Sequence, residues 1–231
     1  MILALAGQKG GVGKSTVAIS IAAELVVRKR KVLLVDADPQ GTSRTWGEVA
    51  SESGHPLPTI VAMGATMHRP DQLPRVAGGY DHVVIDCPPR HGEIQRSALM
   101  VADVVLLPCG PSAADAWALA SSVELLTEAR ALRPELAAFI VITRKQVNTA
   151  ISKGAREVLA QSGVPVAATE LGYRVAFAEA LGAGLGATTY APKDAAAAEV
   201  RALVDELLTT ERRRRAQEAP ARKPAKAPRR R

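Results

Sequence analysis

Short, continuously apolar runs alternate along the chain with longer segments in which apolar residues recur every three or four positions. Val32–Val35 and Val83–Ile85 are examples of the runs, and strands buried on both faces have this composition. The alternation predicts repeated β-α units around a parallel sheet. Strands are expected at 2–6, 31–36, 59–63, 81–86, 103–108, 138–143 and 164–168. Helices are expected at 14–29, 92–101, 113–131, 149–161, 173–181 and 194–210.

The last of these helices has one apolar stripe at helical spacing, formed by Val200, Leu203, Val204, Leu207 and Leu208. The simplest interpretation is that the stripe packs on the sheet. The alternative is a helix that lies on a membrane surface. Such a helix needs apolar residues as well as charge, and residues 211–231 contain no Leu, Phe or Trp.

Charge is concentrated at the end of the chain. The chain has a formal net charge of +7, while residues 211–231 carry eight Arg and two Lys against two Glu, so residues 1–210 are close to neutral. We expect one domain over residues 1–210 and a disordered basic tail over 211–231.

Composition gives no sign of export or of a metal cluster. No apolar run approaches the roughly 18–20 residues of a membrane span, and no signal peptide precedes the first strand. Cys87 and Cys109 lack metal-ligand or disulfide spacing. The four histidines, at 55, 68, 82 and 91, also lack such spacing, so surface or loop positions are expected. A cytoplasmic location follows as an expectation.

Residues 7–16 carry the strongest chemical signal. Their sequence, Gly-Gln-Lys-Gly-Gly-Val-Gly-Lys-Ser-Thr, follows a buried strand and opens a helix, which is the arrangement of a phosphate-binding P-loop. Backbone N–H groups and the helix N-terminus favour phosphate there, while Lys14 would reach the outer phosphates and Ser15 would coordinate Mg²⁺. The strict motif is not met, because Gln8 replaces its first glycine, and a second lysine, Lys9, is present. The expected nucleotide contacts are Lys9, Gly10, Gly11, Val12, Gly13, Lys14, Ser15 and Thr16.

Two further strand ends carry carboxylates. The second strand ends in Asp36-Ala37-Asp38-Pro39-Gln40, and the fourth runs into Asp86-Cys87-Pro88-Pro89. The carboxyl ends of parallel strands share one edge of a sheet, so these side chains can face the P-loop. Alone, the first segment could equally be a helix-capping loop. Four apolar residues followed by Asp86 form a Walker B pattern, in which the carboxylate lies beside Mg²⁺.

Taken together, these segments resemble the ParA/MinD superfamily of signature-lysine ATPases, whose P-loop is a deviant Walker A motif. The resemblance implies a P-loop NTPase of the α/β class, with a mostly parallel twisted sheet of about seven strands and helices on both faces. It also implies ATP and Mg²⁺ as ligands and a homodimer in which Lys9 touches the partner's ATP. By the same resemblance Asp38 orients or activates water, and Asp36 supports the metal through water. The expected metal-site residues are thus Ser15, Asp36, Asp38 and Asp86.

The resemblance covers residues 1–208 and is greatest to small plasmid-type ParA proteins that lack an N-terminal helix-turn-helix. Residues 108–115 and 142–145 continue it. In that family the segment at Thr143 and Arg144 and the loop at 190–194, which contains Pro192, tend to hold adenine. Regulation of specific operators is not expected.

ParA-type dimers bind nonspecific DNA, and this chain has Arg and Lys clusters without interleaved aromatics, which suits phosphate-backbone contact. A solvated helix face is the alternative for the body residues, and a solubilising extension is the alternative for the tail. The DNA candidates are Arg144, Lys145, Lys153, Arg156, Arg174, Arg201, Arg212, Arg213, Arg214 and Arg215.

The function implied is an ATPase that partitions or positions a plasmid, a chromosome region or a protein body on nucleoid DNA. A ParB-like or other adaptor protein would stimulate hydrolysis, which is expected to be slow without it. A MinD-like membrane-cycling regulator is the first alternative, and a metabolic enzyme of the dethiobiotin synthetase type is the second. Iron–sulfur carriers of the superfamily need paired cysteines that this sequence lacks. A loose Gly-x-Gly-x-x-Ala pattern at 182–187 follows a helix, so a helix end is expected there.

Overall fold

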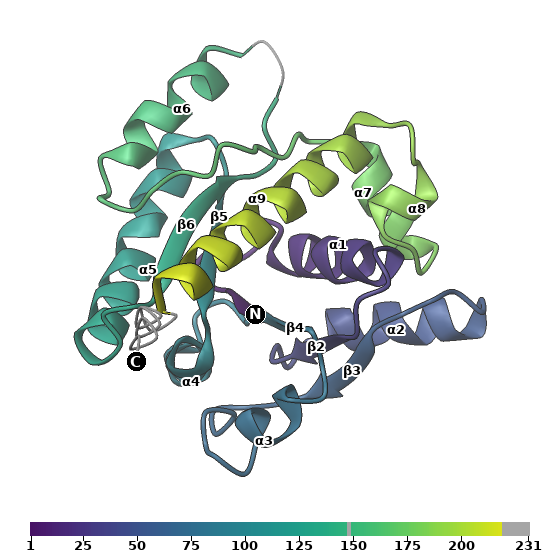
Figure 1. The fold of residues 1–231 in the computed structure, drawn as a ribbon. Helices are drawn as coiled ribbons and strands as arrows, with labels where there is room; N and C mark the ends of the chain where they lie inside the picture. The colour runs from purple at the N-terminus through teal and green to yellow at the C-terminus, as the bar shows by residue number, and fades with distance from the viewer. Residues whose placement is uncertain (147–148, 219–231) are drawn as a thin grey trace, which may run out of the picture.

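The computed structural model describes residues 1–146 and 149–218. Within them the strands form one parallel six-stranded sheet of order β3-β2-β4-β1-β5-β6, with β1 near its centre (Figure 1). The α/β class and the parallel sheet are confirmed. The strands are β1 (Ile2–Leu5), β2 (Val32–Asp36), β3 (Thr59–Ala62), β4 (His82–Asp86), β5 (Val104–Cys109) and β6 (Ala137–Ile142).

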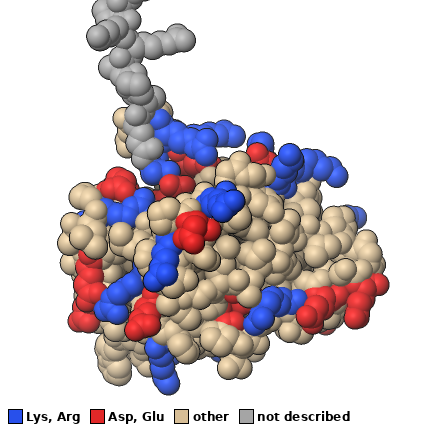
Figure 2. All heavy atoms as spheres, turned by 90° about the horizontal axis from the view of Figure 1, so that it is seen from below, with Lys and Arg blue, Asp and Glu red and all other residues tan. Residues whose placement is uncertain are grey.

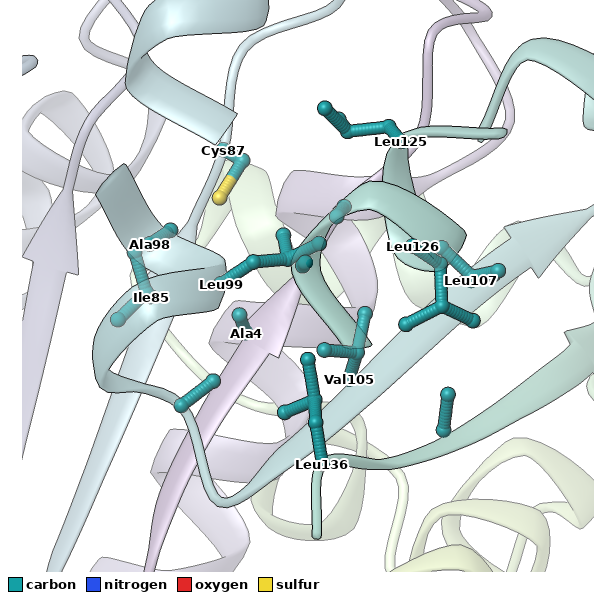
Figure 3. Packing of buried hydrophobic residues seen from close by; sticks show 14 of the residues in the cluster. Ala4, Ile85, Cys87, Ala98, Leu99, Val105, Leu107, Leu125, Leu126 and Leu136 are labelled. Atoms are coloured by element: carbon teal, nitrogen blue, oxygen red, sulfur yellow. The ribbon is translucent and has the colours of Figure 1, made fainter. Parts of the chain in front are cut away.

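Side chains along each strand alternate between two hydrophobic cores. In β1, Leu3 and Leu5 enter one core and Ala4 enters the other, because successive strand residues point to opposite faces. Figure 3 shows the second core, where Leu99 of α4 and Leu126 of α5 pack over Ala4 and Val105. Covering the first core are α1 (Lys14–Val27), α2 (Thr42–Glu52), α7 (Val175–Gly182), α8 (Ala187–Tyr190) and α9 (Ala195–Glu218). Covering the second are α3 (Leu73–Ala77), α4 (Gly92–Val101), α5 (Ala113–Leu132) and α6 (Ala150–Ala160).

The seventh strand, predicted at 164–168, is not formed. Val166 makes only an isolated bridge to Ile140 of β6. The N–H of Ala167 still donates to the Ile140 carbonyl at 2.8 Å, but the next two N–H groups, of Ala168 and Thr169, donate to the carboxylate of Glu206 on α9, at 2.7 and 3.0 Å. A side chain therefore takes the Thr169 donor that would have continued the ladder after Ala167, and the sheet ends at β6.

Three short or polar helices were not predicted, namely α2, α3 and α8. The α2 segment has no continuous apolar stripe, and its N-terminus begins at Gly41, which has no side chain to cap it. The cap comes from Asp36, whose Oδ2 accepts from the backbone N–H of Arg44 at 2.9 Å. The signal for this helix therefore lies outside its own sequence.

The apolar stripe of α9 packs inward, as expected. Val200, Leu203 and Val204 are each 1% exposed and belong to the core beneath α1. This finding removes the basis for a membrane-surface role of that stripe. None of the helices in the described ranges is long and apolar enough to cross a bilayer.

The predicted end of the last helix at 210 is wrong, because α9 continues to Glu218. The carboxylate of Glu211 is buried and pairs with the amino group of Met1 at 3.1 Å, and Arg214 pairs with Asp103 at 2.7 Å. His82 was expected at the surface or in a loop, but it is the first residue of β4 and is buried beside Glu211 of α9. This burial lowers the pKa of His82. Of the predicted disordered tail, residues 219–231 lie outside the described part of the chain.

Candidate functional site

The P-loop and the strand-end carboxylates meet at one edge of the sheet. The sheet register places Leu5, the last residue of β1, opposite Asp86 of β4, and Asp86 opposite Asp36 of β2. Since β1 continues directly into the P-loop, the phosphate-binding backbone lies beside both carboxylates. This is the crevice outside the carboxyl ends of parallel strands, where ligands of open α/β sheets bind.

The P-loop backbone adopts a conformation that depends on glycine. Gly11 and Gly13 have φ values of 73° and 92°, in the left-handed region that disfavours side chains, and Gly13 is the N-cap of α1. The loop is held from β6: the Thr143 hydroxyl donates to the Val12 carbonyl at 2.7 Å, and Arg144 Nη1 donates to the Gly11 carbonyl at 2.8 Å. Two of the three residues predicted near adenine therefore also support the loop.

Two polar side chains that the sequence did not reveal hold the start of the loop. Gln95 of α4 is fully buried; its Oε1 accepts from Gly7 N at 3.3 Å, and its Nε2 donates to the Pro88 carbonyl at 2.7 Å. It therefore links the P-loop to the segment after Asp86. Ser122 of α5 accepts from the N–H of Gln8 at 3.1 Å. Neither residue belongs to a motif, so only the fold brings them to the site.

Lys14 lies in the centre of this arrangement. The residue is only 6% exposed, and its Nζ donates to the backbone carbonyl of Lys9 at 2.8 Å. Burial lowers the pKa of Lys14, while the nearby charge of Asp86 acts in the opposite direction. The α1 N-terminus and this ammonium make the position attractive to an anion.

Asp86 is fully buried and only half satisfied. Its Oδ2 accepts from the Ser43 hydroxyl at 2.9 Å, whereas Oδ1 has no hydrogen-bond partner among the described residues. Burial raises the pKa of Asp86 to about 7, and the nearby Ser15 and Ser43 hydroxyls oppose the rise. A buried carboxylate oxygen without a partner, next to the Ser15 hydroxyl, is suited to a hard divalent cation.

The remaining ligands of such a cation would have to come from elsewhere. Residues 1–146 and 149–218 contain no group of three or more His, Cys, Asp or Glu side chains able to hold a metal. Mg²⁺ commonly binds through one or two protein groups together with phosphates and waters. Ser15 and Asp86 fit that pattern.

The two carboxylates of the segment after β2 are used differently. Asp36 is buried; its Oδ2 caps α2 and also pairs with Arg44 Nε at 3.3 Å, while its Oδ1 accepts from Asp38 N at 3.2 Å. The capping interpretation therefore describes the contacts of Asp36. Asp38 is half-buried, and the only hydrogen bond that its carboxylate accepts among the described residues comes from Gln40 N, at 2.9 Å. Its carboxylate is the more available of the two.

Lys9 turns away from the phosphate-binding backbone. Its Nζ lies 2.8 Å from Oδ1 of Asp115 at the start of α5, and the two side chains are 37% and 14% exposed. Burial raises the pKa of Asp115, but the hydrogen bonds from Lys9 and Ser112 outweigh it and lower the pKa overall. The second lysine is thus held by its own chain rather than by the P-loop.

A cavity of about 330 Å³ opens beside the P-loop. Gly11 and Gly13 line one side, and Thr143, Arg144 and the exposed ring of Tyr173 line the other. The Arg144 guanidinium lies 5.8 Å from the Tyr173 ring centre, so a flat cationic and aromatic wall borders the cavity. Pro192 does not line it; the Pro192 carbonyl instead accepts from Arg201 at 3.0 Å.

Most predicted DNA-contacting residues on the body already have partners. Lys145 and Arg156 both pair with Glu170, and Arg174 pairs with Glu199. Figure 2 shows basic and acidic side chains interspersed over the face that it presents. Lys153 lies on α6, and its side chain is outside the described part of the structure.

The basic end of α9 is similarly divided. Arg214 and Arg215 pair with Asp103 and Glu211, whereas Arg212 and Arg213 are exposed.

The Gly-x-Gly-x-x-Ala stretch at 182–187 is a helix end, as expected. Gly184, at φ 67°, follows the end of α7, and the backbone of Ala50 in α2 approaches it so closely that a Cβ on Gly184 would lie 2.6 Å from Ala50 N.

Comparison with known proteins adds the following. Residues 3–187 match the family model of the CobQ/CobB/MinD/ParA nucleotide-binding domain. Maintenance of carboxysome distribution protein A of Halothiobacillus neapolitanus is 32% identical over 209 residues, covering 89% of this chain and 95% of that protein. Chromosome-partitioning ATPase Soj of Thermus thermophilus is 31% identical over 235 residues, covering 89% and 94%.

Among solved structures, an ATP complex of Cyanothece McdA superposes with a TM-score of 0.75 at 16% identity. The match covers 89% of this chain and 95% of that one. At this level of identity the likeness concerns the fold alone.

Proposed function

The chain belongs to the CobQ/CobB/MinD/ParA nucleotide-binding family, and from that premise we propose that it is a ParA-type ATPase with ATP and Mg²⁺ as ligands. The observation that carries the proposal is the arrangement around Asp86. A buried carboxylate with one oxygen unpartnered among the described residues adjoins Ser15, the buried Lys14 and the glycine-rich backbone. Phosphoryl transfer requires mainly such positioning and charge neutralisation.

Each residue has a distinct task in this proposal. The backbone of residues 10–16 cradles the phosphates, and Lys14 neutralises charge on the outer ones. Ser15 and Asp86 hold Mg²⁺, which when bound neutralises phosphate charge. Asp38 orients the attacking water, for which its half-buried carboxylate is available. The base lies in the cavity between Arg144, Thr143 and the P-loop.

ATP binding is proposed to produce a homodimer. Lys9 is not needed inside its own site, because its ammonium points to Asp115 instead. In the dimer it would contact the phosphates bound by a second copy. This assignment extends the resemblance of the Lys9 motif to the signature-lysine ATPases.

The dimer is proposed to bind nonspecific DNA and to position cargo, with a partner protein that stimulates hydrolysis. The similarity to proteins named for carboxysome distribution and for chromosome partitioning supports this class of function. The exposed Arg212 and Arg213 are the stronger candidates for phosphate contacts. Lys145, Arg156 and Arg174 would first have to release Glu170 or Glu199.

DNA binding with ATP, ADP or no nucleotide tests the proposal. Fluorescence anisotropy of a random-sequence duplex is measured across a salt series with residues 1–231 and with residues 1–218. The cut at 218 keeps α9 whole. We expect ATP-dependent binding that persists in 1–218 with a shallower salt dependence, because fewer counterions are released.

DNA binding that is the same with ATP, with ADP and without nucleotide, and that disappears in 1–218, would contradict the proposal. The binding would then come only from the charge of residues 219–231. The same samples are mixed with anionic lipid vesicles as a parallel arm. ATP-dependent sedimentation with vesicles, without DNA binding, would favour a MinD-like membrane cycle instead.

A further inference from the structure

In the ion pair of Lys9 with Asp115, the carboxylate is held in place by further hydrogen bonds from its own helix cap. Asp115 is the third residue of α5 and forms a capping box with Ser112, the N-cap. Its Oδ2 accepts from the Ser112 N–H at 3.2 Å and from the Ser112 hydroxyl, which leaves Oδ1 for the Lys9 ammonium at 2.8 Å. The carboxylate is therefore fixed before Lys9 reaches it.

The backbone around the pair leaves room for that carboxylate and for little else. A Cβ on Gly110 would lie 2.4 Å from Asp115 Oδ2 and 2.7 Å from its Cγ, so any side chain at 110 would displace the Asp115 carboxylate. The space among Lys9, Asp115, Cys109 and Ser122 amounts to about 10 Å³. At most one water fits there.

Lys9 also contacts the other lysine of the loop. Its backbone carbonyl accepts from Lys14 Nζ, while its own ammonium points to Asp115. One residue thus joins the buried lysine of the P-loop to the first turn of α5. A movement of Lys9 toward another molecule has to break the contact with Asp115.

We propose that Asp115 is a positioning residue that retains Lys9 within its own chain and thereby restrains ATP-dependent dimer formation. The inference rests on the proposed function, in which Lys9 serves the nucleotide of a second copy. To do so its ammonium exchanges one anion, the Asp115 carboxylate, for another, the partner's phosphates.

The test is the dimerisation constant of Asp115→Asn with a non-hydrolysable ATP analogue, measured by sedimentation velocity. Asn keeps an oxygen for the Ser112 N–H but removes the charge that holds Lys9. Ion pairs of this exposure change an equilibrium constant by a factor of about 1.4–5. We expect the dimer of Asp115→Asn to be roughly two- to fivefold tighter than that of the wild type.

Three variants separate retention of Lys9 from a general effect on α5. Ser112→Ala weakens the helix cap but leaves the ion pair, and it should dimerise like the wild type. Gly110→Ala keeps every charge but displaces the carboxylate, so it should tighten the dimer as Asp115→Asn does. A Lys9→Met protein should stay monomeric, and adding Asp115→Asn to it should not restore the dimer, because there is no ammonium to release.

Equal or weaker dimerisation of both Asp115→Asn and Gly110→Ala, with the melting temperature and ATP affinity unchanged, would overturn the inference alone. A dimer formed by the Lys9→Met, Asp115→Asn double variant would also overturn it. A wild type that stays monomeric with the ATP analogue would contradict the proposed dimer, and the inference would fall with it.

Discussion

The P-loop and the end of α9 are both rich in cations, but they use them in different ways. Lys9 and Lys14 belong to a glycine-rich loop at the carboxyl edge of the sheet, and each has one defined partner: Asp115 of α5 for Lys9 and the Lys9 carbonyl for Lys14. The end of α9 lies at the opposite edge, where Arg214 pairs with Asp103 just before β5 and Glu211 pairs with Met1 before β1. The number of cations therefore does not indicate which region binds phosphate; their position relative to free backbone N–H groups does.

The largest expected effect is that of Lys14→Ala on ATP binding. The substitution removes the one buried cation of the P-loop, and we expect the affinity for ATP to fall by about 100-fold or more. Isothermal titration calorimetry measures it, with Arg213→Ala at the end of α9 as the control that keeps full affinity. Equal losses in the two variants would mean that the two cationic regions are not distinct.

Asp86→Asn is expected to stabilise the fold while removing the response to Mg²⁺. The pKa of Asp86 is raised from 3.8 to about 7, so the folded state holds a proton that the unfolded state releases between these values. The wild type therefore loses stability as the pH rises from 3.8 toward 7, and above pH 7 its folded state carries a buried negative charge. At pH 8 the variant should gain roughly 2–4 kcal/mol, or about 5–10 °C in Tm.

Thermal melting at pH 8 and pH 5 without Mg²⁺ checks this. At pH 5 the folded wild type is protonated, but its unfolded state still releases the proton because pH 5 lies above 3.8, so the variant should keep only about a third to a half of the stabilisation that it has at pH 8. A stabilisation that is the same at both pH values would contradict the assigned cause.

Truncation of α9 after residue 210 tests whether the cations at the amino edge of the sheet stabilise the fold. Removing residues 211–218 leaves the Met1 amino group, whose surroundings are buried, without the Glu211 carboxylate. We expect residues 1–210 to lose about 2–4 kcal/mol of unfolding free energy relative to 1–218, because a buried charge becomes unpaired. Urea unfolding measures the difference. Equal stability would show that α9 after residue 210 contributes nothing to the domain.

The smallest effects are expected for single arginines of α9. Arg214→Ala should destabilise the fold by about 1 kcal/mol, through lost packing and the lost pair with Asp103, while Arg212→Ala should leave stability within about 0.5 kcal/mol. For DNA, Arg212→Ala should reduce the slope of log affinity against log salt by about 0.9. Urea unfolding and salt titrations measure the two effects. A loss of stability in Arg212→Ala together with a reduced salt slope in Arg214→Ala would contradict these separate roles.

Much of the fold could be predicted because its strands are buried on both faces. The continuous apolar runs of β2, β4 and β5 leave little ambiguity, and the bounds of α4 agree with the prediction. The predictions failed where a distant side chain decides the local structure. Asp36 caps α2 from the end of β2, and the Glu206 side chain accepts from the N–H groups of residues 168 and 169.

The site shows the same division. Backbone chemistry makes Gly11, Gly13 and Lys14 recognisable, since a phosphate-binding turn requires these residue types at this spacing. Ser43, Gln95 and Ser122 have no such signature, because each acts through one hydrogen bond that exists only once the sheet and helices are assembled. The contact of Lys9 with Asp115, 106 positions away, could not be predicted for the same reason.

The most direct test of the central claim is the sedimentation coefficient of the wild type and of Lys9→Ala, each with ATP and Mg²⁺ and with ADP and Mg²⁺. The account predicts a dimer only for the wild type with ATP, and an ATP affinity of Lys9→Ala that falls far less than that of Lys14→Ala. A Lys9→Ala protein that dimerises with ATP as well as the wild type would contradict it.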